Sequence, residues 1–184
     1  MVRALSCAAA ALVLAAGAAR AMPGEMPWDH AGGPGRPDCT ECHFDSEAVE
    51  HSPALRLEGL PERAVPGRSY DLVLRLEADG LETAGFLVRA QTAAAQEAGL
   101  PPGRFLPAND RTEAGEGAIR STESGARQKR PGVAEWRFSW RAPGRSVGVV
   151  TMYVAATAAN DDRSPLGDSV HLFQTAVTVE PPDD

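Results

Sequence analysis

The chain has 184 residues, 43% of them hydrophobic and 23% charged, which is the composition of a globular protein with one domain of ordinary size. Its formal charge of −7 argues against nucleic acids and anionic membrane surfaces as partners. An acidic surface would suit a basic protein partner, although charge alone does not identify one.

The first 21 residues have the three parts of a secretory signal peptide. Arg3 begins a short positive region, residues 4–18 form an apolar run, and Ala19-Arg20-Ala21 offers the small-x-small cleavage pattern. The apolar run is shorter than the roughly 20 residues that span a bilayer. Cleavage near Ala21 removes both arginines and leaves a formal charge of −9. We therefore expect a periplasmic or secreted protein that is not embedded in a membrane.

Two short segments follow the signal peptide. Residues 22–37 contain eight Gly or Pro among 16 residues, which predicts a linker. Asp38 followed by Glu41 is a capping-box pattern, so residues 38–52 are expected to begin as a short helix. Pro53 ends that helix, because the residue before a proline avoids helical geometry.

The predicted helix carries the motif Cys39-Thr40-Glu41-Cys42-His43. Of the three cysteines in the chain, Cys7 leaves with the signal peptide, so no thiol outside this motif remains for a disulfide. Cys-x-x-Cys-His attaches haem c: both thiols add to the haem vinyl groups, and the histidine becomes the proximal iron ligand. The sequence thus predicts one covalent haem on Cys39 and Cys42, with His43 on the iron.

Three other interpretations of the motif stay open. A thioredoxin-like redox pair needs a βαβ setting, which a Gly/Pro linker does not provide. A zinc site needs four ligands, which the motif and either His30 or His51 would supply. The third interpretation is a simple disulfide between the two cysteines.

The second axial ligand of a haem is not fixed by the sequence. His51 is eight residues beyond His43, too far along a continuous helix to reach the opposite haem face. His30 lies before the flexible Gly/Pro run, as do Met22 and Met26. A sixth position left open to water is the remaining alternative.

One loop after a long apolar segment is rich in oxygen ligands. Asn160, Asp161, Asp162 and Asp168 are a candidate calcium site, although such residues are more often simple turn formers.

From residue 53 to residue 180 the apolar pattern has the period of β-strands. Trp136, Phe138 and Trp140 alternate with polar residues, which is typical of a half-buried antiparallel strand. Strands are also expected at residues 54–58, 70–77, 86–92, 147–156 and 169–180. About seven strands without helical periodicity predict a mainly β, immunoglobulin-like antiparallel sandwich. Residues 181–184 form a tail.

Residues 93–132 are polar and rich in Gly, Arg and Glu, so we expect long loops there with at most a weak strand at 118–121. Arg127, Lys129 and Arg130 form a basic cluster within them. A solvated loop is the simpler interpretation of this cluster, and a docking patch for a partner is the other.

Several short motifs together resemble the bacterial reelin-like domains called choice-of-anchor V. They are Cys39 to Asp45, Leu57-Glu58-Gly59-Leu60-Pro61, Pro66-Gly67-x-x-Tyr70, Gly85-Phe86, Trp136 to Pro143, and Val150 to Asn160. The resemblance covers about residues 38–179 and implies an exported immunoglobulin-like or reelin-like sandwich. In that family the Cys-x-x-Cys-His motif lies just before the sandwich, and haem binding is inferred from it. The segment 119–131 departs from the family pattern.

Three functions follow as hypotheses. The first is a monohaem c-type electron carrier with a redox protein partner. The second is a non-redox extracellular binding or adhesion module in which the motif is a disulfide or metal clip. The third is a haem sensor or minor oxidoreductase with an open iron site. No motif singles out an enzyme, and the sequence leaves the oligomeric state open.

Overall fold

The computed structural model describes residues 26–92, 101–128, 130–162 and 164–180. The predicted signal peptide, residues 22–25 of the predicted linker, Lys129 and the predicted tail lie outside these ranges. Among the described residues, none of the helices has the length and apolarity that crossing a bilayer would take.

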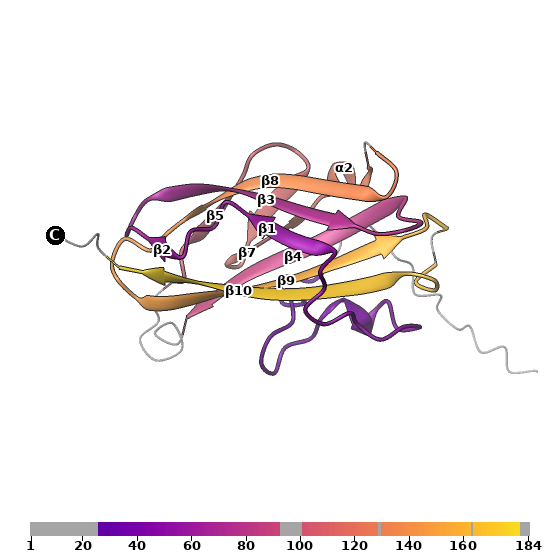
Figure 1. The fold of residues 1–184 in the computed structure, drawn as a ribbon, viewed down its shortest axis with the longest axis horizontal. Helices are drawn as coiled ribbons and strands as arrows, with labels where there is room; N and C mark the ends of the chain where they lie inside the picture. Colours follow the sequence, from indigo (N-terminus) through magenta and orange to yellow (C-terminus); the bar gives the residue numbers. More distant parts are fainter. Residues whose placement is uncertain (1–25, 93–100, 129, 163, 181–184) are drawn as a thin grey trace, which may run out of the picture.

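Two sheets pack face to face to form a β-sandwich (Figure 1). One sheet has four strands in the order β1-β3-β8-β5, and the other has six in the order β2-β10-β9-β4-β7-β6. The pairings are antiparallel except for the short parallel pairing of β2 with β10. The strands are β1 (Leu55–Glu58), β2 (Arg63–Ala64), β3 (Ser69–Glu77), β4 (Thr83–Thr92), β5 (Arg104–Pro107), β6 (Thr112–Gly115), β7 (Ala118–Ser121), β8 (Val133–Arg141), β9 (Gly148–Ala159) and β10 (Ser169–Val179).

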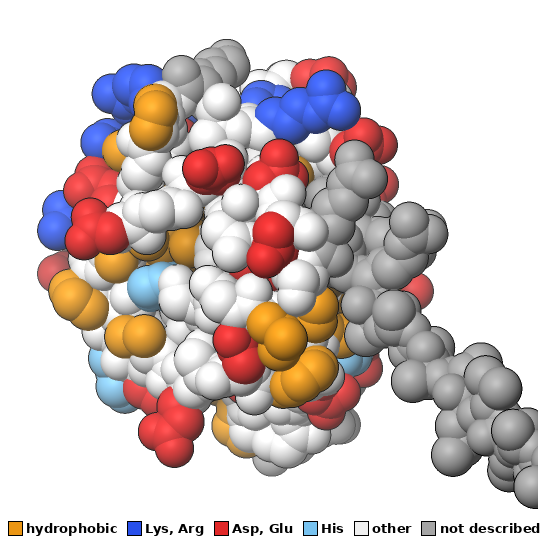
Figure 2. Space-filling model, turned by 90° about the vertical axis from the view of Figure 1, so that its right-hand side faces the viewer, with side chains coloured by type: hydrophobic (Ala, Val, Ile, Leu, Met, Phe, Trp, Pro, Cys, Tyr) orange, Lys and Arg blue, Asp and Glu red, His pale blue; other side chains and the backbone are white. Residues whose placement is uncertain are grey.

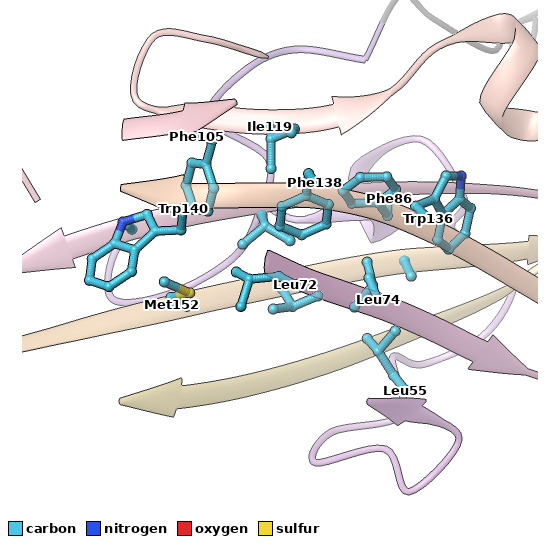
Figure 3. Close-up of a cluster of buried hydrophobic side chains, with 14 of the residues drawn as sticks. Leu55, Leu72, Leu74, Phe86, Phe105, Ile119, Trp136, Phe138, Trp140 and Met152 are labelled. Atoms are coloured by element: carbon cyan, nitrogen blue, oxygen red, sulfur yellow. The ribbon is translucent and has the colours of Figure 1, made fainter. Parts of the chain in front are cut away.

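The core lies between the inner faces of the two sheets (Figure 3). The predicted alternation on β8 is confirmed: Trp136, Phe138 and Trp140 are each at most 1% exposed. Phe86 on the opposite sheet packs on both Trp136 and Phe138, with ring centroids 4.7 and 5.7 Å apart. These rings pack together because period-2 alternation puts every second side chain on the buried face.

The prediction of loops between residues 93 and 132 is wrong in part. The weak strand expected at residues 118–121 is present as β7, but strands β5 and β6 and the one-turn helix α2 (Glu123–Ala126) also lie there. β6 and β7 form a hairpin whose two turn residues, Glu116 and Gly117, both have positive φ. Positive φ at both turn residues is typical of a type I′ turn, which suits two-residue hairpins. Its usual sequence signals are Asn-Gly and Asp-Gly, so the Glu-Gly pair did not reveal the hairpin. Residues 93–100 of the predicted loop are outside the described residues.

The predicted helix over residues 38–52 is also wrong beyond its first turn. Only a 3₁₀ turn forms, η1 (Cys39–Glu41), with Asp38 as its N-cap. The chain then continues through turns, and Val49 pairs with His171 of β10 by backbone hydrogen bonds to Val170 and Leu172. A short helix is marginal on its own, and the pairing with β10 uses the backbone groups that would have continued it.

The segment before the sandwich covers the outer face of the six-stranded sheet, and we call residues 26–52 the strap. In Figure 1 it lies beneath β9 and β10, on the side away from the four-stranded sheet. Ala31 packs with Leu87 and Ala118, while Trp28 stacks under the guanidinium of Arg120 at 4.1 Å. Residues 26–37 of the predicted linker are therefore part of the packed structure despite their Gly and Pro content.

The aromatic core predicts the effect of one substitution. We expect Trp136→Ala to lower the free energy of unfolding by about 3–5 kcal/mol, because it empties a site enclosed by both sheets. Val149→Ala, at a position that is 54% exposed, is the control and should change stability by less than about 0.5 kcal/mol. Urea unfolding followed by tryptophan fluorescence measures both. Equal small losses in the two variants would contradict the assigned core.

Candidate functional site

The Cys-x-x-Cys-His motif lies where the strap crosses β9 and β10. Cys39 is only 6% exposed and packs with Ala155, Val170 and Leu172 of the outer sheet face. Cys42 is exposed, and both cysteines are free thiols. The two thiols of the motif therefore have very different surroundings.

Burial also changes the acidity of Cys39. Loss of solvation raises the pKa of its thiol to about 11, and the negative charge of nearby Asp38 adds to the increase. A hydrogen bond with Thr157 opposes this effect without cancelling it. Because the thiolate is the reactive form of cysteine, the buried thiol of Cys39 reacts slowly while the strap is packed on the sheet.

His43 is fixed by a residue far away in the sequence. Its Nδ1 lies 2.7 Å from Oδ2 of Asp168, just before β10. The Asp168 side chain is fully buried, and its other oxygen, Oδ1, has no hydrogen-bond partner. Burial raises the pKa of the Asp168 carboxyl, and the hydrogen bond from His43 counteracts part of that rise.

Two more hydrogen bonds attach the same part of the strap to the loop before β10. Ser46 Oγ donates to the Asp168 carbonyl at 3.0 Å, and the backbone N–H of Gly167 donates to the carboxylate of Asp45. Together with the His43–Asp168 pair, these bonds fasten the motif across the end of the sheet.

The two histidine candidates for a second iron ligand lie in different environments. His30 is close to the motif, but its ring nitrogens face carboxylates: Nδ1 lies 2.9 Å from Asp29 and Nε2 lies 3.3 Å from Glu41. His51 is exposed and has a positive φ of 50°. Neither one is directed to His43 by a contact between described residues.

The candidate calcium residues lie near one another but are engaged in separate interactions. Asn160 and Asp162 bond to each other, the amide of Asn160 to Oδ2 of Asp162 at 3.3 Å and the backbone of Asp162 to Oδ1 of Asn160 at 3.1 Å. Asp161 is exposed beside them, whereas the carboxylate of Asp168 is directed to His43. Within the described parts of the chain, no group of three or more His, Cys, Asp or Glu residues is arranged to hold a metal ion.

A covalent haem needs both thiols of the motif to be accessible on the side where His43 meets the iron. His43 and the exposed Cys42 meet this need, since the bond of Nδ1 to Asp168 leaves Nε2 for a metal. Cys39 does not, because its thiol is enclosed against Ala155, Val170 and Leu172. The motif as folded here therefore does not fit a haem unless residues 38–43 leave the sheet.

A second histidine cluster was missed by sequence reasoning. His171 is 7% exposed, with Nδ1 at 2.8 Å from Ser52 Oγ and Nε2 at 3.1 Å from Ser169 Oγ. Burial lowers the pKa of His171. The partners are 119 and 2 residues away in sequence, so only the close approach of the strap to β10 reveals the cluster.

The fold is similar to solved reelin-type domains. It matches the reeler domain of human F-spondin (fragment 1) with a TM-score of 0.51 and 16% identity, covering 72% of this chain and 95% of that one. It also matches the Reelin-N domain of F-spondin with a TM-score of 0.52 and 17% identity, covering 77% and 96%. No family model and no curated protein matches the sequence. The chain thus has a reelin-like fold, and the predicted sandwich is confirmed.

The burial of Cys39 predicts unequal thiol chemistry. In the folded, reduced protein at pH 8, we expect Cys39 to be alkylated at least about 100-fold more slowly than in the unfolded chain, because of its raised pKa and its enclosure. Cys42 is exposed and should react at a similar rate in both states. Timed iodoacetamide labelling with peptide mass mapping measures both rates. Rapid labelling of Cys39 in the folded protein would show that the strap does not hold it.

The buried His171 predicts a pH dependence of stability. A histidine whose folded pKa lies below the unfolded value of 6.5 is neutral in the folded state, so protonation favours unfolding. Stability from this group is complete above pH 6.5 and falls as the pH drops towards the folded pKa. We expect wild-type stability to decrease more between about pH 7.5 and pH 5.5 than that of His171→Gln. Urea unfolding at both pH values measures the difference, and parallel pH profiles would contradict the expectation. His51→Gln, at an exposed position, serves as the control.

Proposed function

We propose that this protein works outside the cytoplasm as a non-catalytic binding module of the reelin-like type. The observation that carries the proposal is the match of the two-sheet sandwich to the reeler domain of F-spondin over 72% of this chain. The predicted signal peptide supports an exported location. A rigid sandwich of this kind presents its loops and outer strands as fixed binding surfaces.

In this proposal the Cys-x-x-Cys-His motif is a structural clip. Cys39 contributes a small apolar side chain to the contact between strap and sheet, a common role for a buried cysteine. His43 reaches the buried Asp168 and compensates for part of the cost of enclosing that carboxylate. Both interactions hold the strap in place without any bound group.

Haem attachment is the second candidate, and the environment of His43 favours it. Its Nδ1 is held by a buried carboxylate, the arrangement that fixes the orientation of metal-bound histidines. Phe44 is 61% exposed, and Leu166, at 50%, precedes the Gly167 that bonds to Asp45. These apolar side chains beside the motif would cover part of a haem, which would supply one-electron redox chemistry to a protein partner. Attachment would require residues 38–43 to lie off the sheet, because only there is the Cys39 thiol accessible.

One preparation decides between the two functions. We expect protein secreted with an active c-type maturation system to have the mass of the apo chain, with Cys39 and Cys42 as thiols or as a disulfide. Its reduced pyridine-haemochrome spectrum should be blank. A mass gain of one haem with both thiols consumed would overturn the structural-clip assignment and establish the haem protein. Cys39→Ser with Cys42→Ser is the matched control, since it removes both attachment points.

The same apo preparation tests binding directly. Fluorescently labelled protein should bind saturably to intact cells of the producing organism or to their extracellular polymer, and unlabelled protein should compete. Binding that rises linearly without saturation would contradict a binding module, whatever the state of the motif.

A further inference from the structure

Four arginines lie together at one end of the sandwich, where β3 and β5 begin and β8 ends, at the left of Figure 1. The register of the strands places Arg104 of β5 directly opposite Arg141 of β8. Arg68 precedes β3, and its carbonyl accepts a hydrogen bond from the N–H of Ala142 at 2.9 Å. Arg145 lies in the turn between β8 and β9. We call these four arginines, all of them exposed, the basic end.

The protein does not neutralise these charges by itself. Within the described part of the chain, the side chains of Arg104 and Arg145 have no ion pair or hydrogen bond, and Arg141 donates only from Nε, to a backbone carbonyl at 3.1 Å. Arg68 lies over the ring of Tyr70, 5.6 Å from its centroid. Like charges directly opposite each other on neighbouring strands repel, so the pairing of Arg104 with Arg141 costs free energy that a docked carboxylate would recover.

Two acidic residues of the same region are already bonded elsewhere. Glu180 pairs with Arg63 at 2.8 Å, and Asp71 accepts a hydrogen bond from Ser139 Oγ at 2.7 Å. The basic end therefore keeps its positive charge, although the chain as a whole carries −7.

A shallow, largely apolar hollow of about 270 Å³ adjoins the basic end. It is lined by Pro101, Pro143, Gly144, Arg145 and Val147. A hollow of this size and lining accepts one apolar side chain, as the anchor pockets of protein interfaces do. The basic end thus combines positive charge with a place for an apolar anchor.

The opposite end of the sandwich has the complementary charge. The 12 residues of β9, at about 3.3 Å each, lead from the turn that carries Arg145 to the β9–β10 loop. This loop contacts the strap, because the N–H of Gly167 donates to Asp45 and Ser46 donates to the carbonyl of Asp168. Residues 44–50 and 160–167 together contain five Asp or Glu and one Arg. We call the described residues of these two segments the acidic end.

Apolar side chains are exposed among these acidic ones. Phe44 is 61% exposed, Leu166 50% and Val49 42%. Glu47 and Glu50 are exposed beside them and have no hydrogen bond or ion pair to another described residue. Figure 2 views this end of the sandwich: acidic and apolar side chains lie over its middle and lower parts, while most Lys and Arg gather along the upper edge. An apolar patch with a charged rim is typical of a surface that binds another protein.

We propose that the basic end of one copy docks on the acidic end of a second copy, so that the protein associates head to tail. Phe44 of the second copy packs into the hollow beside Arg145, and Glu47 and Glu50 face the paired arginines. The planar guanidinium suits this contact, because it binds a carboxylate through two parallel hydrogen bonds.

The two docking surfaces lie at opposite ends of the molecule, so the contact is heterologous and does not close after two copies. The inference goes beyond the proposed binding function and does not depend on it. Head-to-tail association would give one assembly many copies of a binding surface, which raises its avidity.

Sedimentation velocity of the full mature apo protein, with its thiols reduced, tests the association. At low ionic strength we expect the weight-average mass to rise with concentration and to pass that of two copies. In about 0.5 M salt the association should weaken about tenfold or more, because exposed charges are screened. A protein that stays monomeric up to about 1 mM, a mass that stops at two copies, or association that salt does not weaken would overturn the proposal.

Two single variants locate the basic surface. Arg141→Glu should weaken the association about fivefold or more, because it puts a carboxylate against the acidic end. Arg137→Glu makes the same change in charge four residues earlier on the same face of β8, away from both ends, and should change the association by less than about twofold. Equal losses in the two variants would mean that net charge alone controls the association, and would refute the docking surface.

Blocking one end at a time tests the head-to-tail geometry. Arg141→Glu with Arg145→Glu blocks the basic end, and Phe44→Ser with Glu47→Gln and Glu50→Gln blocks the acidic end. Each blocked variant alone should stay monomeric where the wild type associates. An equal mixture should form a complex of two copies and stop there, because one intact surface of each kind remains. This complex would also show that both variants fold. Self-association of either blocked variant, or a mixture that stays monomeric where the wild type associates, would contradict the assigned surfaces.

Discussion

Strand β9 is largely buried on both of its faces, and the architecture follows from the need to cover each of them. Met152 and Val154 face the core between the sheets, while Ala155 and Thr157 on the opposite face are also buried. An antiparallel sheet commonly leaves one face to water. Here the strap covers the second face, and it lies flat because Gly33 passes so close to the ring of Tyr153 that a Cβ would be 2.9 Å from it.

This packing decides what the Cys-x-x-Cys-His motif does in the folded protein. The side chain of Cys39 serves the contact with the sheet, and His43 serves the contact with Asp168. A motif whose residues are used for docking is not at the same time open for attachment. The two functional hypotheses therefore correspond to two states of one segment: closed on the sheet as a clip, or open and joined to a haem.

Charge is distributed differently from what the net value suggests. Acidic groups of the strap and of the β9–β10 loop pair with histidines or accept backbone hydrogen bonds, as Glu41, Asp45 and Asp168 do. Arginines gather at the far end of the sandwich, where Arg104 lies directly opposite Arg141. An acidic protein thus has one cationic end, because the position of its charges matters more than their total for a docking surface.

The amino-acid sequence by itself determined the class of fold and the strands of the core. Trp136, Phe138 and Trp140 gave a period-2 signal that depends only on neighbours along the chain, and Asp38 gave a cap that forms within three residues. It also displayed the Cys-x-x-Cys-His motif, whose chemistry can be stated without a fold. The basic residues Arg127 and Arg130 were visible as a cluster, but not the pairing of Arg104 with Arg141 across the sheet.

Only the tertiary structure decided how the strap is arranged. The expected helix over residues 38–52 gave way to pairing of Val49 with β10, and the Gly/Pro-rich residues before it became packed structure. The carboxylate of Asp168 bonds to His43, which is 125 residues away in the sequence. Such partners have no signal in the local sequence, because burial of the outer face of β9 brings them together. The free energy gained by covering that face exceeds the weak helical preference of a short segment.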